Sequence, residues 1–112
     1  MNSEIANFET EMNRGFLQIL VLALLEEEMY GYSMVRTIRD LGYEVEENTL
    51  YPLLRRLEKN GWVRSRWDLS EDRPRKFYAI TAAGLKLRNQ LIGIRRKQDQ
   101  ILNRILKEKS HV

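Results

Sequence analysis

The stretch that decides the fold reads Asn48-Thr-Leu-Tyr-Pro-Leu-Leu-Arg-Arg-Leu-Glu-Lys-Asn-Gly61. Its leucines recur every three or four residues, which predicts an amphipathic helix. The helix should end near Gly61, because glycine readily takes the left-handed conformation that stops a helix. Asn48 and Thr49 are candidate caps. Pro52 falls in the expected first turn, where its missing N–H costs little. The buried stripe is expected to consist of Leu50, Leu53, Leu54 and Leu57.

The side chains that lie off this stripe are suited to contact DNA. A recognition helix needs a buried apolar stripe and an outward face of groove-reading residues. Arginine and lysine reach phosphates or guanine edges, and hydroxyl groups contact base edges or the backbone. An ordinary surface helix with solvated charges explains this segment equally well. The candidate DNA-binding residues are Asn48, Thr49, Tyr51, Arg55, Arg56 and Lys59.

Two strands are predicted after this helix, at Trp62–Asp68 and Lys76–Ile80, from their aromatic and β-branched residues. The polar segment between them, Leu69–Arg75, is typical of a hairpin loop. Pro74 stiffens it, and a stiff basic loop beside a recognition helix suits the phosphate backbone or a minor groove. The acidic pair Glu71-Asp72 favours a solvated turn instead. The candidate DNA-binding residues here are Arg73, Arg75 and Lys76.

The segments before residue 48 predict helices that build the core. Arg14–Glu28 is apolar most of the way round, which indicates a helix buried on several sides. Ser3–Met12 is expected to form a short separate helix that packs on another element or on a partner subunit. Gly31 is expected to supply a turn, and Tyr32–Leu41 a further helix stopped by Gly42. Its inward residues are Met34, Val35, Ile38 and Leu41.

The last predicted helix runs from about Ala82 to Lys107 and is capped by Thr81. Apolar residues along it alternate at spacings of three and four, the pattern of a coiled-coil seam. A helix of this length cannot fold fully back on so small a core, so we expect it to pair with its counterpart in a homodimer. A helix docked on its own domain is the alternative. The candidate dimerisation residues are Leu87, Leu91, Ile94, Ile101, Leu102 and Ile105.

The predicted order is therefore helix, helix, helix, strand, strand, long helix. It indicates a mainly α winged helix-turn-helix fold. We expect residues 1–80 to form the winged-helix domain with an N-terminal helical extension, and residues 81–112 the dimerisation helix, together as one compact unit.

Composition and charge narrow the function. Residues 1–47 carry ten acidic and three basic side chains, whereas residues 48–112 carry six and sixteen. This asymmetry suggests that the second half meets a polyanion. The chain has no cysteine, and its one histidine, His111, lies next to the C-terminal residue. We therefore expect no metal, no cofactor and no enzyme activity. The acidic N-terminus is not a signal peptide and no apolar run could span a membrane, so a cytoplasmic location is expected.

Two strings show a resemblance to a known family. The quoted string 48–61 resembles the recognition-helix signature of PadR transcriptional regulators. Arg73-Pro-Arg-Lys-Phe-Tyr-Ala-Ile-Thr-Ala-Ala-Gly84 resembles the wing strand and the following helix start. The resemblance covers roughly residues 13–106. It departs at Asn48, where members commonly have glycine, and at Glu71-Asp72, which replace glycines of the wing tip. The single helix after the wing resembles the compact members.

The resemblance implies a homodimeric repressor on a pseudo-palindromic double-stranded operator, released by a ligand or another signal. Half-sites would lie about 10 base pairs apart, or a multiple of that. In some relatives an aromatic-lined space near the dimer interface takes flat hydrophobic compounds, which implies a small hydrophobic or aromatic effector. The final helix here has no aromatic residue, so those pocket residues are not carried over. The alternative function is a winged-helix protein-interaction module without specific DNA binding, because fold does not decide function.

Overall fold

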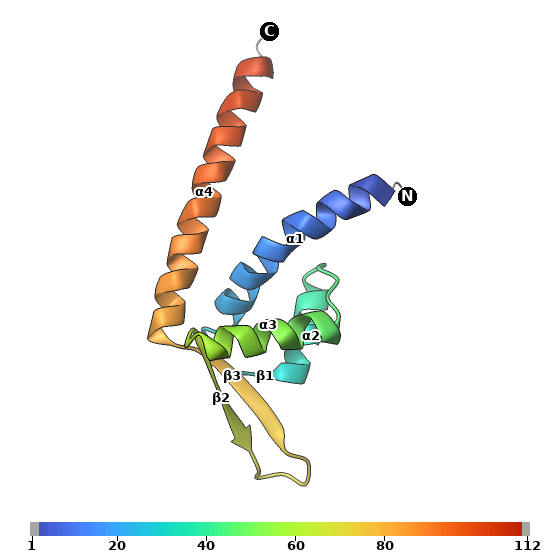
Figure 1. Cartoon of the computed structure of the whole chain (residues 1–112), viewed down its shortest axis with the longest axis vertical. Helices are drawn as coiled ribbons and strands as arrows, with labels where there is room; N and C mark the ends of the chain where they lie inside the picture. The colour runs from blue at the N-terminus through green and yellow to red at the C-terminus, as the bar shows by residue number, and fades with distance from the viewer. Residues whose placement is uncertain (1–2, 111–112) are drawn as a thin grey trace.

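The computed structural model describes residues 3–110, so His111 lies outside the described residues. The element order agrees with the predicted winged helix-turn-helix fold (Figure 1). One short strand is added to the predicted elements. In chain order the elements are α1 (Ser3–Leu24), β1 (Met29–Tyr30), α2 (Gly31–Asp40), α3 (Glu47–Lys59), β2 (Val63–Asp68), β3 (Arg75–Ile80) and α4 (Ala82–Ser110).

The expected separate helix at Ser3–Met12 is wrong, because α1 runs unbroken from Ser3 to Leu24. The sequence divided this region into two helices, Ser3–Met12 and Arg14–Glu28, whereas the structure joins them across Asn13. Tertiary contacts support the helix at this point. The hydroxyl of Tyr43 donates a hydrogen bond of 3.0 Å to the carbonyl oxygen of Asn13. The Tyr43 ring also packs on Phe16, with ring centroids 5.7 Å apart.

The core lies where the second half of α1, the helices α2 and α3 and the sheet meet. Its large side chains are excluded from solvent, as the periodicity of the sequence predicted for all four leucines of α3. Leu41 was expected to point inward and is 62% exposed, because it caps α2 and no longer follows the helix periodicity. The fully buried side chains are Val21, Leu22, Leu25, Met34, Ile38, Leu50, Leu54, Leu57 and Val63.

Helices α2 and α3 both end in the same motif. Gly42 and Gly61 have φ of 97° and 80°, in the left-handed region that glycine tolerates, as predicted for these two residues. The N–H of Tyr43 reaches back to the carbonyl of Ile38, and the N–H of Trp62 reaches back to that of Leu57. These bonds satisfy helix-terminal carbonyls and set the direction in which the chain leaves each helix.

The start of α3 differs from the expectation. The helix begins at Glu47 after the cap residue Glu46, and no side chain makes a capping hydrogen bond there. Asn48 and Thr49 therefore lie in the first turn and do not cap it. Pro52 consequently lies inside the helix, beyond its first turn. A proline there cannot donate the usual bond to the carbonyl four residues earlier, which belongs to Asn48.

The sheet has three antiparallel strands in the order β1-β3-β2. The predicted hairpin pairs Val63 with Ile80 at one end and Asp68 with Arg75 at the other. Figure 1 shows this hairpin as a wing that projects beyond α3. The added strand β1 pairs Met29 with Tyr78. Gly31, expected to supply a turn, is instead the buried first residue of α2 and has no positive φ.

A compact joint connects α4 to the rest of the chain. Thr81 caps α4 as predicted, because its Oγ1 accepts a hydrogen bond of 3.0 Å from the N–H of Gly84. The same hydroxyl donates to the carbonyl of Gly61 at 2.6 Å, and the N–H of Thr81 donates to the carbonyl of Trp62 at 3.1 Å. From this joint α4 extends away from α3, and the distance between α4 and α1 widens toward their far ends (Figure 1).

Candidate nucleic-acid interface

The outward face of α3 carries a central stripe of exposed side chains opposite the buried leucines. Asn48, Pro52, Arg55 and Lys59 are spaced by four, three and four residues, so they share one face of the helix. Neither cation of the stripe forms an ion pair within the described part of the chain. Pro52 was not among the predicted site residues. Its apolar ring lies between the polar groups of the stripe. The helical spacing of Pro52 from Asn48 and Arg55 could have identified it from the sequence.

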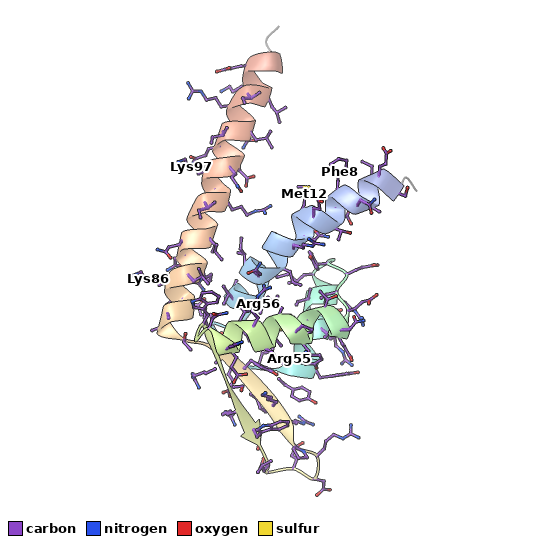
Figure 2. The ribbon with its side chains drawn as sticks, viewed as in Figure 1. Phe8, Met12, Arg55, Arg56, Lys86 and Lys97 are labelled. Carbon is purple, nitrogen blue, oxygen red and sulfur yellow. The ribbon has the colours of Figure 1, made fainter. Side chains whose placement is uncertain are left out.

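Two predicted residues, Thr49 and Arg56, lie on the flank of α3 that faces α1. They line a shallow pocket of about 290 Å³ together with Arg14, Leu17 and Gln18 of α1. Figure 2 shows Arg55 and Arg56 on opposite sides of α3, with Arg56 on the side of α1. The two adjacent arginines therefore point to different sides of α3, a difference that the sequence alone did not reveal.

Tyr51 lies on the opposite flank of α3, which faces the wing. Its ring touches the start of α2, because a Cβ placed on Gly31 would stand 3.3 Å from the Tyr51 ring and 3.0 Å from the Tyr78 ring. Burial raises the pKa of both tyrosines, with Glu47 adding to the effect at Tyr51 and Glu58 at Tyr78. Both side chains are consequently protonated phenols at neutral pH and can donate hydrogen bonds.

The predicted wing cations differ in their surroundings. Arg73 is exposed, with no ion pair among the described residues, whereas Arg75 pairs with Glu71 at 3.0 Å. Lys76 is one-third exposed and lies 3.9 Å from the carboxylate of Glu58 on α3. Glu58 also accepts a hydrogen bond from the hydroxyl of Ser65. The carboxylate of Glu58 thus holds Lys76 close to α3.

A second ion pair joins the wing to the turn between α1 and β1. Arg66 on β2 donates two hydrogen bonds to the carboxylate of Glu28, at 2.8 and 2.6 Å. This contact lowers the pKa of Glu28 below its ordinary value of 4.5, mainly through the hydrogen bond from Arg66. The guanidinium also lies over the ring of Phe77, 4.9 Å from its centroid. The pairing orients Arg66 within the protein and leaves the loop end of the wing free.

Three tyrosines at the base of the wing, Tyr30, Tyr32 and Tyr78, were missed by the sequence reasoning. Together with Tyr51, Trp67 and Lys76 they line a pocket of about 290 Å³ between the start of α2, α3 and the wing. In the sequence, Gly31 was expected to supply a turn and Tyr32 to begin the next helix. The aromatic content of Tyr30-Gly31-Tyr32 was the signal, but the residues that complete the pocket lie 19 to 48 residues away in the sequence.

The predicted dimerisation residues fall into two groups. Leu87 and Leu91 are half-buried against the core of their own chain. Ile94, Ile101, Leu102 and Ile105 are about half exposed on the distal part of α4. The first half of α1 carries a second exposed apolar set, Ile5, Phe8 and Met12. Figure 2 shows Phe8 and Met12 on one side of α1, while Lys86 and Lys97 lie on the side of α4 away from α1.

Other kinds of site are not found in the described part of the chain. Among residues 3–110, no group of three histidine, cysteine or carboxylate side chains could hold a metal ion. No described helix combines the length and the apolar character that a membrane span requires.

Known proteins resemble this chain over most of its length. The sequence model of the PadR-like family of transcriptional regulators matches residues 20–90. A transcriptional regulator of Mycobacterium tuberculosis is 33% identical over 102 residues, which cover 90% of this chain and 92% of that protein. A PadR family transcriptional regulator from Eggerthella lenta has a crystal structure with a TM-score of 0.86 at 36% identity, covering 93% of each chain.

A further solved structure has the same fold at lower identity. A PadR-like transcriptional regulator from Bacillus cereus matches with a TM-score of 0.77 at 28% identity, covering 86% of this chain and 96% of the other. The family match spans the last five residues of α1, every element from β1 to β3 and the first nine residues of α4. This chain belongs to the PadR-like family of transcriptional regulators.

Proposed function

We propose that this regulator is a sequence-specific DNA-binding repressor that acts as a homodimer. The observation that carries the proposal is the outward stripe of α3, whose cations Arg55 and Lys59 have no protein partner among the described residues and stand beside a projecting wing. In this proposal the stripe enters the major groove, where arginine reads guanine and the proline ring can contact a thymine methyl group. Arg73 contacts the phosphate backbone from the wing, and Thr49 and Arg56 contact it from the side of α1.

The dimer half of the proposal rests on exposed apolar surface. Soluble chains rarely leave a large contiguous apolar patch in water. Here the distal part of α4 exposes Ile94, Ile101 and Ile105, and the first half of α1 exposes Phe8 and Met12. A second copy of the chain, packing its own α1 and α4 on these faces, would remove both from solvent. Such a dimer presents two recognition helices to a pseudo-palindromic operator.

DNA recognition is tested by binding and footprinting on the DNA upstream of the gene for this protein, at low and physiological salt. A protected inverted repeat with roughly nanomolar affinity supports the proposal. Weak, sequence-blind binding that disappears at physiological salt contradicts it for that DNA and favours a protein-interaction module. Selection of binding sites from random duplex DNA then extends the test to every sequence.

A double substitution assigns the role of α3. We expect Arg55→Ala with Arg56→Ala to weaken operator binding by roughly 1–3 kcal/mol for each base that the variant can no longer reach, with an unchanged unfolding temperature because both side chains are exposed and unpaired. The matched control is Lys86→Ala with Lys97→Ala on the outer side of α4 (Figure 2). It removes the same charge and should change affinity far less. Equal effects of the two pairs would mean that net charge, not position on α3, drives binding.

The release signal is proposed to be a small flat hydrophobic compound. A pocket of about 230 Å³ between α1 and α4 is lined by Met12, Phe16, Ile19, Leu91 and Ile94 among others, and the guanidinium of Arg95 lies over the Phe16 ring. The pocket adjoins the surface assigned above to the second copy, so a ligand there could change how the two copies pack. Screening aromatic compounds for loss of operator binding tests this step, and retention of binding with every compound that the protein takes up would contradict it.

A further inference from the structure

We propose that the tyrosine-lined pocket between the start of α2, α3 and the wing is a binding site for one phosphate of the DNA backbone. The inference rests on the proposed function, because the DNA must be docked by α3 for a phosphate to reach this place. Compared with the proposed function, this inference adds two DNA contacts that lie outside α3. One comes from Tyr78 of the central strand β3, and the other from the backbone at the start of α2. The pocket measures about 290 Å³ and opens beside the wing base.

The first observation is a hydroxyl on a buried side chain that has no protein partner among the described residues. Tyr78 is only 5% exposed, yet within the described residues its hydroxyl makes no hydrogen bond. Buried phenol groups normally find a partner. Among the described residues, no side-chain polar atom is both unpaired and sealed from solvent. The Tyr78 hydroxyl is therefore accessible, and we place it at the pocket that its ring lines. Its partner must therefore come from outside the protein.

The second observation is the start of α2. The first N–H groups of a helix have no acceptor within the helix and carry a partial positive charge. At α2 the cap residue Tyr30 makes no side-chain hydrogen bond, and no acidic residue lies in the first turn. Gly31, the first residue of α2, lies against the rings of Tyr51 and Tyr78. The glycine thereby lets both phenols approach the helix terminus, since a Cβ there would stand 3.0 Å from the Tyr78 ring.

Hydrogen-bond donors and one cation line the pocket. Lys76 lines it and lies over the rings of Trp67 and Tyr78, 5.7 and 5.5 Å from their centroids. The acid nearest to this lysine, Glu58, is already engaged with the Ser65 hydroxyl and with Lys76 itself. Phenol hydroxyls, an ammonium group and a helix N-terminus are all donors, and a phosphate oxygen accepts from each of them.

The position of the pocket identifies the phosphate. It lies on the flank of α3 that faces the wing, next to the stripe proposed to enter the major groove. The DNA strand at the edge of the major groove passes along such a flank. Phosphate contacts of this kind determine the register of a protein on the duplex. We therefore assign the site to a backbone phosphate of each half-site, not to a free phosphorylated ligand.

The test uses the full-length protein and removes single hydroxyl groups. Tyr78→Phe should weaken operator binding roughly tenfold, as expected when a hydrogen bond to a charged group is removed, while the unfolding temperature of the free protein stays the same. Tyr43→Phe is the matched control, because its hydroxyl donates to Asn13 inside the protein, away from the pocket. It should lower the unfolding temperature and leave DNA affinity unchanged. The opposite pattern in the two variants is the signature of the site.

A second arm locates the phosphate. Each operator duplex in this arm carries one neutral methylphosphonate in place of one phosphate. At one position in each half-site, the replacement should lower the affinity of the wild type but leave the affinity of Tyr78→Phe as it is for the unmodified duplex. If wild type binds the operator but Tyr78→Phe binds equally well, or no such position exists, this inference is overturned and the DNA-binding function stands. Absence of specific binding by wild type overturns both. Inorganic phosphate that competes with DNA at low millimolar concentration would assign the pocket to a free ligand and overturn the backbone contact.

Discussion

Replacing Gly84 by alanine should destabilise the protein, although alanine is the better helix former by up to about 1 kcal/mol. A Cβ at this residue would overlap the carbonyl oxygen of Trp62 and stand 2.8 Å from Ile80 Cγ1. The carbonyl is backbone and cannot move aside as a side chain does. The start of α4 must therefore separate from the turn between α3 and β2, which strains the hydrogen bonds from Thr81 to Trp62 and Gly61.

The magnitude follows from this geometry. Two hydrogen bonds at about 1 kcal/mol each and an overpacking cost of about 1–3 kcal/mol outweigh the gain in helix propensity. We expect a net loss of roughly 2–4 kcal/mol in the free energy of unfolding. For a chain of this size that lowers the melting temperature by roughly 10 °C or more. Operator affinity should fall as well, because this joint sets the direction of α4 relative to the recognition helix.

The assay is thermal and urea unfolding at one fixed protein concentration, since association shifts the apparent stability. Gly93→Ala is the control on the same helix. A Cβ there meets nothing within 4 Å, and the residue lies off the apolar seam, so this variant should be more stable than wild type by up to about 1 kcal/mol. A Gly84→Ala protein that melts at or above the wild-type temperature would refute the close approach of α4 to the α3–β2 turn.

Three further predictions test the dimer, the recognition helix and the wing. Ile101→Asp, on the exposed distal part of α4, should shift the protein from dimer to monomer in sedimentation; an unchanged dimer would remove this residue from the interface. Glu58→Gln should strengthen DNA binding, because it removes the negative charge beside Lys76, and unaltered affinity would show that the carboxylate does not restrain this lysine. Because Arg66 lowers the pKa of Glu28, the carboxylate stabilises the fold above its ordinary pKa of 4.5 and loses this effect as pH falls through the folded value. Glu28→Gln should therefore be less stable than wild type at pH 7. The difference in the free energy of unfolding should shrink in buffers more acidic than that ordinary pKa. A difference that does not change with pH would contradict the ion pair.

Periodicity determined the parts of the fold that depend on local pattern. The leucines of α3 share one face of any helix at their spacing, so their burial and the opposite polar face followed directly. The helix stops at Gly42 and Gly61 were equally local, because only glycine reaches that conformation without strain. The exposed face of α3 was accordingly predicted from spacing, apart from the ring of Pro52, whereas DNA contact by the residues of α3 stays a prediction.

The errors arose where distant residues decide a local structure. The continuity of α1 through Asn13 has support from Tyr43, thirty residues later in the sequence. The strand β1 is two residues long, too short for any period, and exists only because β3 supplies its hydrogen bonds. The start of α3 moved to Glu47 although better capping residues follow, since an extended connector places the helix there without a side-chain cap.

By itself, then, the amino-acid sequence determined the order of elements, the buried stripe of each helix and the family of this regulator, because these depend on residue type and spacing along one chain. Only the tertiary structure decided which cations are free and which are held by acids, that Arg55 and Arg56 serve different sides of α3, and that the Tyr78 hydroxyl is left without a partner beside the start of α2. The physical reason is that hydrogen bonds and ion pairs act over a few ångströms. Their partners here are separated by up to about sixty residues of sequence, a separation that no local pattern records.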